Sequence, residues 1–350
     1  MFVIRPIKKS DLSTLMHLLK DSGHGLTSLP KDEKIIADKI EFSERSFDHR
    51  KDGPGGESYL FVMEEVFTGK IVGVSGIISK IGGFQAYYFY RLETETIKSK
   101  MINVEKKIRT LTMEKTHSGP AEICSLFLAP DYRNSQNGRF LSLSRFLFMA
   151  EDQEYFENEV IAEMRGQVNE NGESPFWNAV GHKFMDIDFL QADYLTMKSK
   201  AFIDELLPKY PIIVDLLPED AQKVVAEVHP HTAPARHILE QEGFQFKGLV
   251  GIFEPGPVLE AKLSNVRAYK ESKVVTIKEI SRQEIDSEVF IISTSGKKKF
   301  KATLGNIAFN ADGTVNVQAV VATALKLKVG EKLRYVGLKA KKQVQTDLEL

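Results

Sequence analysis

The chain alternates between apolar runs with the two-residue period of strands and apolar positions at the spacing of an amphipathic helix. Strands are predicted at residues 2–4, 59–64, 71–78, 87–90, 122–128, 160–164, 249–253 and 258–263. Helices are predicted after Ser10, through Ile36 and Ile40, from about residue 138, after Ser174, at 199–208 and 218–227, and from Thr232 to Gly243. Ser10, Ser174 and Thr232 are the expected N-caps, because a hydroxyl can accept a free amide of the first helical turn.

The pattern changes beyond about Ser272. Short β-rich runs follow one another there, separated by Gly and Asp turns, at 273–280, 289–293, 301–307, 314–321 and 332–338. These runs predict a small all-β subdomain over residues 272–350, which follows a main domain over residues 1–271.

Composition restricts the kinds of partner. The 350 residues are 42% hydrophobic and carry 47 Lys and Arg against 48 Asp and Glu, so no overall positive field attracts nucleic acid or an anionic membrane. The first apolar run is too short for a signal peptide, and no segment reaches the roughly 18 apolar residues of a membrane span. We therefore expect a cytoplasmic protein that binds neither nucleic acid nor membranes. Cys124 is the single cysteine, which excludes an intrachain disulfide.

Residues 122–149 carry the most informative motif, a strand, a polar turn and a helix in succession. The first amides of a helix have no partner within it and carry the positive end of the helix dipole, so they bind phosphate well. The motif therefore predicts a pyrophosphate site, unless it is an ordinary strand-to-helix connection. The turn residues that would make this site are Arg133, Gln136, Asn137 and Gly138.

This segment resembles motif A of the GNAT superfamily of CoA-dependent N-acyltransferases, whose turn reads Arg/Gln-x-x-Gly-x-Gly/Ala. Arg133 and Gly138 fit that turn, and Gln136 replaces its first glycine. Six stretches in order resemble the arginine N-succinyltransferase family more narrowly: 25–30, 133–145, 162–166, 174–177, 229–236 and 256–260. The resemblance implies an α+β, GNAT-like acyl-CoA N-acyltransferase fold, with a mixed, mainly antiparallel sheet flanked by helices.

The resemblance also implies an activity. Members of that family transfer succinyl from succinyl-CoA to the α-amine of L-arginine, giving Nα-succinyl-L-arginine and CoA, as the first step of bacterial arginine catabolism. They require no metal. The resemblance further implies that His229 is the proton donor, that Leu126 binds succinyl-CoA, and that the chain forms a homodimer or pairs with a related subunit.

His229 also suits this chemistry by its residue type and position, apart from the family resemblance. An α-ammonium with a pKa of roughly 8 has to lose a proton before it attacks, and the departing thiolate has to gain one. His229 stands just ahead of a predicted helix and titrates near neutral pH, so it can meet either need. His231 is its rival two residues on, and a histidine that only stabilises the turn is the alternative.

Two pairs of polar residues are candidates for binding the substrate. Glu163 can accept a guanidinium bidentately and Arg165 can hold a carboxylate, although the two can equally form a structural pair. Thr27 and Ser28 can donate to the substrate carboxylate, or they cap the next helix.

Two other functions stay open at this point. One is a CoA-dependent amino-acid N-acyltransferase that uses ornithine or acetyl-CoA, because a single charge or hydroxyl in a pocket can redirect specificity. The other is a catalytically silent CoA-binding module, for which Gln136 in the phosphate turn is the supporting feature.

Overall fold

The computed structural model describes residues 1–22, 26, 28–48, 53–134, 136–169 and 171–340. The strands are β1 (Phe2–Pro6), β2 (Ser58–Glu65), β3 (Ile71–Ile78), β4 (Tyr87–Ser99), β5 (Val104–Thr116), β6 (Ala121–Leu128), β7 (Glu159–Glu163), β8 (Ile212–Ile213), β9 (Gln245–Val250), β10 (Pro257–Lys262), β11 (Lys273–Ser281), β12 (Phe290–Thr294), β13 (Ala302–Gly305), β14 (Ile307–Phe309), β15 (Val315–Gln318) and β16 (Lys332–Gly337). Their order in the sheet is β14-β15-β11-β16-β12-β13-β1-β2-β3-β6-β7-β10-β9-β4-β5-β8. The β6–β7 and β11–β15 pairs are parallel and the other pairs are antiparallel, so the sheet is mixed and mainly antiparallel, as predicted.

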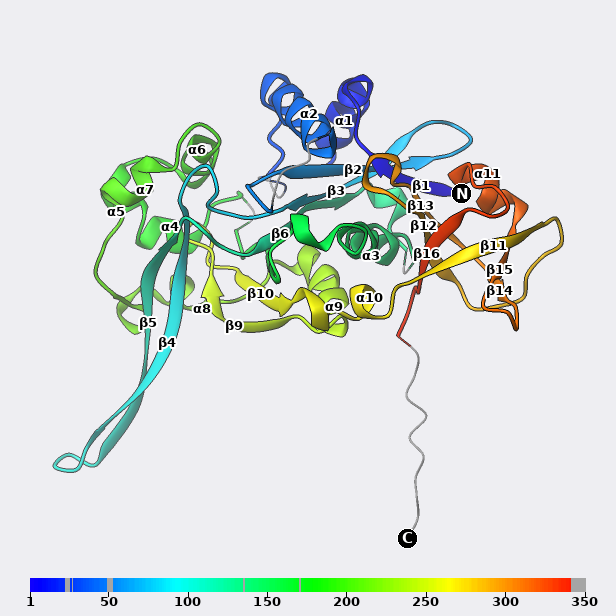
Figure 1. Cartoon of the computed structure of the whole chain (residues 1–350). Coiled ribbons are helices and arrows are strands. Elements are labelled where there is room, and N and C mark those ends of the chain that lie inside the picture. The colour runs from blue at the N-terminus through cyan, green and yellow to red at the C-terminus, as the bar shows by residue number, and fades with distance from the viewer. Residues whose placement is uncertain (23–25, 27, 49–52, 135, 170, 341–350) are drawn as a thin grey trace, which may run out of the picture.

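Helices cover both faces of the sheet (Figure 1). They are α1 (Leu12–Lys20), α2 (Glu33–Asp48), α3 (Asn137–Met149), α4 (Pro175–Ala179), α5 (His182–Met185), α6 (Phe189–Thr196), α7 (Ala201–Leu206), α8 (Glu219–Lys223), α9 (Ala233–Gln241), α10 (Arg267–Lys270) and α11 (Ala319–Leu325). Successive side chains of a strand point to opposite faces. Leu60 and Val62 of β2 therefore pack with the apolar side chains of α1 and α2, whereas Phe61 and Met63 pack with those of α3.

The sheet opens between β6 and β7. These strands pair only at Ala121 with Val160 and at Glu122 with Ile161, after which they separate. Beyond that point the register between β6 and β3 also shifts. Ser125 lies there with a φ of 53°, in the left-handed region that residues other than glycine rarely adopt. Ser125 holds this conformation within a strand, where the surrounding fold has to compensate for its strain.

The predicted elements of the main domain form, with shifted ends, but two of the three predicted caps are wrong. Ser174 caps α4 by accepting a hydrogen bond from the amide of Trp177 at 3.1 Å, as expected. Ser10 lies instead within a 3-10 turn (Lys9–Asp11) that precedes α1, and Thr232 makes no side-chain cap bond to α9. A cap also needs the right backbone placement, which residue type alone does not supply.

The prediction of an all-β C-terminal subdomain is wrong in one element. Residues predicted to end a strand at 314–321 instead begin α11, whose Val321 and Leu325 are buried against the subdomain strands. The strands of this region also continue the main sheet, because β13 pairs with β1. A short apolar segment fits a buried strand and a buried helical face equally well, which is why the pattern did not distinguish them.

Candidate active site

A cavity of about 600 Å³ lies where β6 and β7 separate. Its wall is formed by 122–126 of β6, 162–165 at the end of β7, the 80–85 loop before β4, α6, and the start of α9. Segments that are far apart in the sequence therefore meet where the parallel strands β6 and β7 separate. Open sheets with parallel strands bind ligands at such a point.

Four of the residues predicted for substrates line this cavity: Ser28, Leu126, Glu163 and Arg165. The Ser28 hydroxyl lies 2.9 Å from the Ser125 hydroxyl, so the early loop contacts β6 at its strained residue. Thr27 falls outside the described residues. Arg165 and Glu163 do not bond to each other among the described residues. Instead, the buried Arg165 Nε has no hydrogen-bond partner in this part of the structure.

Three further carboxyl groups in the wall were not predicted: Glu122, Asp193 and Glu254. Burial, with Glu163 nearby, raises the pKa of Glu122 and of Asp193 to about 7, and burial raises the pKa of Glu254 to about 8. Glu122 is 7% exposed, and its carboxyl group accepts no hydrogen bond from a described residue. The wall thus brings four carboxyl groups together with the five cationic side chains of Lys39, Lys80, Arg145, Arg165 and Lys200, so it carries both signs of charge.

Glu163 lies near each of the other three carboxyl groups of the wall. Tyr87 donates a hydrogen bond of 2.7 Å to its Oε2, and the Lys200 ammonium lies 3.7 Å from the centre of the Tyr87 ring. Burial raises the pKa of Glu163, although the surface of its side chain remains open to the cavity. Burial also lowers the pKa of Lys200 and of Lys39, which is another lysine of the wall. Asp193 and Lys200 lie far from β6 in sequence, and no local pattern indicates them.

The two candidate histidines occupy different places. His231 lines the cavity, whereas His229 stands beside it at the start of a short 3-10 turn (Pro230–Thr232). The His229 amide donates to the carbonyl of Arg165 at 2.8 Å, and its Nδ1 accepts from the His231 amide at 3.2 Å. Burial, followed by the charges of Arg165 and His231, lowers the pKa of His229. An accepting Nδ1 leaves the proton of the neutral imidazole on Nε2.

The predicted phosphate residues lie outside the cavity wall, at the start of α3. Gln136 has ordinary helical dihedral angles and is exposed, so its position does not require glycine, and nothing lies within 4 Å of a Cβ built on Gly138. Asn134 already uses its side-chain oxygen to accept the amides of Gln136 and Asn137, at 3.1 and 2.8 Å. Arg133 donates to the carbonyl of Leu128 at 2.9 Å. The start of α3 is therefore exposed, and the Asn134 side chain covers the amides of Gln136 and Asn137.

Arg145 of α3 lines the cavity and bonds to the backbone of β6. Its side chain is 2% exposed, and it donates to the carbonyl of Cys124 at 3.3 Å and to the Ser142 hydroxyl at 2.9 Å. Burial raises the pKa of the Cys124 thiol to about 12, so this cysteine has little thiolate at neutral pH.

Within the described ranges, no group of three or more His, Cys, Asp or Glu residues has the arrangement of a metal site.

Comparison with known proteins identifies the family. The model of the arginine N-succinyltransferase beta subunit family matches residues 2–268, and the model of the C-terminal domain of that subunit matches residues 273–337. The chain belongs to the arginine N-succinyltransferase family. The α+β fold with a mixed, mainly antiparallel sheet that the resemblance implied is confirmed.

The similarity to this family extends over nearly the whole chain. An arginine N-succinyltransferase of Yersinia pseudotuberculosis is 42% identical over 345 residues, 97% of this chain and 98% of that protein. One from Citrobacter koseri is 39% identical, covering 98% and 99%. The structure of arginine/ornithine succinyltransferase subunit AI from Pseudomonas aeruginosa superposes with a TM-score of 0.86 at 33% identity, over 97% of this chain and 99% of that one. No helix among the described residues is long and apolar enough to cross a bilayer.

Proposed function

We propose that this chain transfers the succinyl group of succinyl-CoA to the α-amine of L-arginine, giving Nα-succinyl-L-arginine and CoA. The observation that supports this is the cavity at the β6–β7 opening, which surrounds one space with four carboxyl groups and with the cationic side chains of Lys39, Lys80, Arg145, Arg165 and Lys200. L-Arginine brings a guanidinium, an ammonium and a carboxylate, and the succinyl group brings a second carboxylate. A wall that carries both signs of charge complements this pair of substrates.

The thioester carbonyl would lie against β6. Ser125 and Leu126 fall in the register break of that strand, where a backbone amide outside the regular ladder can donate to the carbonyl oxygen as negative charge develops on it. The side chain of Leu126 then lines the path of the pantetheine. This position agrees with the role that the family resemblance implies for Leu126.

The pyrophosphate would reach the start of α3. Arg133, Gln136, Asn137 and Gly138 are the residues that we propose to bind it, through backbone amides and one guanidinium. Because Asn134 accepts the first two of these amides, phosphate binding requires either that its side chain turns away or that phosphate uses the amides from Gly138 onward.

The amino acid would lie among the charged groups of the wall. We propose that Glu163 accepts the guanidinium, since it is held in place by Tyr87, and that Ser28 and Arg165 donate to carboxylate oxygens. The unpartnered Nε of Arg165 supports this role, because a buried donor without a partner is costly unless a ligand satisfies it.

The reaction then needs three proton transfers. Glu122 accepts one proton from the α-ammonium, and the amine nitrogen forms a bond to the thioester carbon. As the C–S bond breaks, the nitrogen releases its second proton to water and His229 donates a proton to the departing thiolate of CoA, which it regains from solvent. His231 is its rival because it faces the cavity. Every group in this sequence of steps belongs to the protein, to its substrates or to the solvent.

The test is a mass measurement of product. Purified chain with succinyl-CoA and L-arginine should give Nα-succinyl-L-arginine and free CoA thiol, and a panel with L-ornithine and with acetyl-CoA measures the preference for each substrate. Product with ornithine or acetyl-CoA, and none with the proposed pair, would identify a different acyltransferase. Calorimetric binding of CoA without turnover of any pair would identify a silent module.

Two further properties belong to this proposal. We place the reaction in the cytoplasm, because succinyl-CoA is charged and does not cross membranes. We also propose that the chain acts as a homodimer or together with a related subunit.

A further inference from the structure

The β4–β5 hairpin extends beyond the rest of the molecule. The two strands pair from Tyr87 with Thr116 out to Ser99 with Val104, but β9 accompanies β4 only at Tyr90 and Arg91, and β8 accompanies β5 only at Thr110 and Leu111. The outer half has no neighbouring strand on either side in the part of the chain that the structure describes, and it projects from one end of the molecule (Figure 1). A two-stranded ribbon without a covered face is marginally stable in water.

The end of this hairpin is apolar. We define the arm tip as residues 97–107, within which the exposed large apolar residues are Ile97, Met101, Ile102 and Val104. Met101 is 92% exposed. Single exposed apolar residues are ordinary, but four within eight positions at the end of a projecting ribbon form a patch that is typical of an interaction surface.

A second exposed apolar patch lies where the arm meets the body. We define the root patch as Leu206, Tyr210, Ile213 and Leu216, of which Tyr210 is 83% and Leu216 is 78% exposed. This patch adjoins the arm because Ile213 pairs with Thr110 of β5. The arm therefore carries one apolar patch at its tip and another at its root, separated by its free length.

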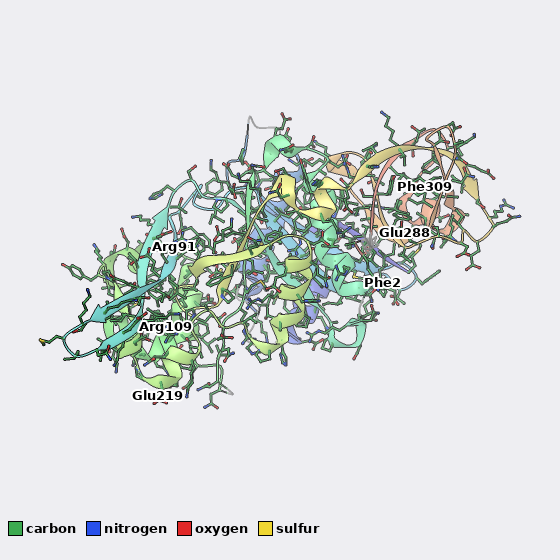
Figure 2. All side chains as sticks on the ribbon, turned by 90° about the horizontal axis from the view of Figure 1, so that it is seen from below. Phe2, Arg91, Arg109, Glu219, Glu288 and Phe309 are labelled. Carbon is green, nitrogen blue, oxygen red and sulfur yellow. The ribbon has the colours of Figure 1, made fainter. Side chains whose placement is uncertain are left out.

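The charges of the two patches are opposite. The arm tip carries four lysines and one glutamate, whereas residues 204–220 around the root patch carry five acidic residues and one lysine. Asp204 and Asp215 pair with Lys115 and Arg109 of the same chain, but other acidic residues remain exposed, among them Glu219 and Asp220. Figure 2 shows Arg109 and Glu219 at the same end of the molecule, opposite Phe309.

We propose that the arm docks onto a second copy of this chain, with each tip covering the root patch of the other copy. In a two-fold dimer the same surface is used twice, so a contact from tip to root is matched by one from root to tip. Two arms that lie side by side in opposite directions satisfy this condition. The tip and the root are at opposite ends of each arm, so each tip then lies against the root of the other arm. The pairing brings apolar residues together and sets tip lysines against root carboxylates.

The test is the oligomeric state of the full chain by sedimentation velocity over a dilution series. Met101→Glu with Ile102→Glu should weaken the dimer about 30-fold or more, as expected for removal of a central apolar anchor. Val329→Glu is the matched control, since Val329 is 59% exposed in the C-terminal region, and it should leave the dimer unchanged. Leu216→Glu should weaken the dimer as the tip variant does.

Charge reversal adds a test of the partner. Lys106→Glu with Lys107→Glu should weaken the dimer, and addition of Glu219→Lys with Asp220→Lys should restore it. Turnover in excess substrate checks that each variant is folded, since the arm tip lies outside the cavity wall. A wild-type chain that stays monomeric, a dimer indifferent to the tip changes, or association only with a different subunit would each overturn the proposal. None of these outcomes depends on which acyl-CoA the enzyme uses.

Discussion

Glu122 stands at the last position where β6 pairs with β7, and its side chain enters the cavity. It is the one charged residue of this strand, and burial together with Glu163 raises its pKa to about 7. A carboxyl group with a pKa near the working pH is suited to accept a proton and to release it again. At the residue scale, the position of one side chain relative to a separating strand pair decides its chemistry.

We expect Glu122→Gln to reduce kcat/KM by about 100-fold or more, because the amide cannot accept the substrate proton. The wild-type rate should rise with pH through about 7, as Glu122 loses its proton, and the variant should lack this limb. The measurement is a pH profile of kcat/KM. Glu260→Gln is the control, because burial also raises the pKa of Glu260 but its side chain lies outside the cavity wall. A wild-type limb that persists in Glu122→Gln would assign the proton acceptor to another group.

The same substitution should affect stability in the opposite direction. The pKa of Glu122 is above its ordinary value of 4.5 in the folded state, so this group's contribution to stability is complete below about pH 4.5 and is lost as pH rises through about 7. Glu122→Gln should therefore be more stable than wild type at pH 8, by about 2–3 kcal/mol, with a smaller difference at pH 5. Urea unfolding at the two pH values measures this. Equal stability at pH 8 would mean that the carboxylate is well solvated.

The two histidines can be separated by single substitutions. His229→Ala should fold and bind CoA but lose about 100-fold or more of kcat if it donates the proton to the thiolate. The lowered pKa of His229 makes its imidazolium a stronger acid but a smaller fraction of the protein at neutral pH, so low pH should favour that transfer. His231→Ala is the matched comparison, two residues away on the same turn. Near-normal kcat for His229→Ala together with an inactive His231→Ala would move the role to His231.

At the scale of elements, the cap of α4 shows how a local signal is completed by distant contacts. The Ser174 side chain is fully buried and accepts the Trp177 amide, and it also donates to the carbonyl of Phe253 at 3.0 Å. Phe253 lines the cavity, so this one hydroxyl holds α4 against the cavity wall.

Ser174→Ala should lower the free energy of unfolding by about 1–2 kcal/mol, because it removes a cap and leaves a buried carbonyl without its donor. Ser10→Ala is the control. Ser10 resembles a cap in sequence but makes no cap bond in the structure, so its loss should change stability by less than about 0.5 kcal/mol. Thermal unfolding followed by circular dichroism compares the two. Equal shifts for both variants would contradict the assigned roles.

The sequence pattern did not predict β5, and this has a physical explanation. The outer part of β5 is exposed on both faces, so it has no buried side from which a two-residue apolar period can arise. Its pairing with β4 is formed by backbone hydrogen bonds, which any sequence of suitable propensity can make. Hydrophobic periodicity therefore did not predict the outer part of the arm, whereas it did predict the buried strands β2, β3 and β6.

At the scale of the whole molecule, the C-terminal region is joined to the rest by a shared sheet and by one buried ion pair. Arg334 of β16 pairs with Glu151 at 2.6 Å and donates to the carbonyl of Ala150 at 2.8 Å. Both charged side chains are largely buried. We propose that residues 1–271 and 272–350 are two units in the sequence that unfold together.

Arg334→Ala should lower the free energy of unfolding by about 3–5 kcal/mol, because it leaves the buried carboxylate of Glu151 unpaired. A single calorimetric transition should move to lower temperature. Lys298→Ala is the control, since its ion pair with Asp48 is well exposed and should contribute little. Two transitions in the wild-type chain, with only the C-terminal one shifted by Arg334→Ala, would show that the two units are independent.

The sequence by itself determined the elements with a buried face, the cap at Ser174, the motif that resembles the GNAT turn, and the residues Ser28, Leu126, Glu163 and Arg165 of the cavity wall. These depend on local spacing and residue type, which are present before the chain folds. Only the tertiary structure decided which charges share a space. Asp193, Lys200 and Glu254 come together with Glu122 because distant segments pack around the gap between β6 and β7, and burial there changes what their side chains can do. The placement of His231 in the wall, with His229 beside it, was likewise a matter of packing, since two histidines on one turn look equivalent along the chain.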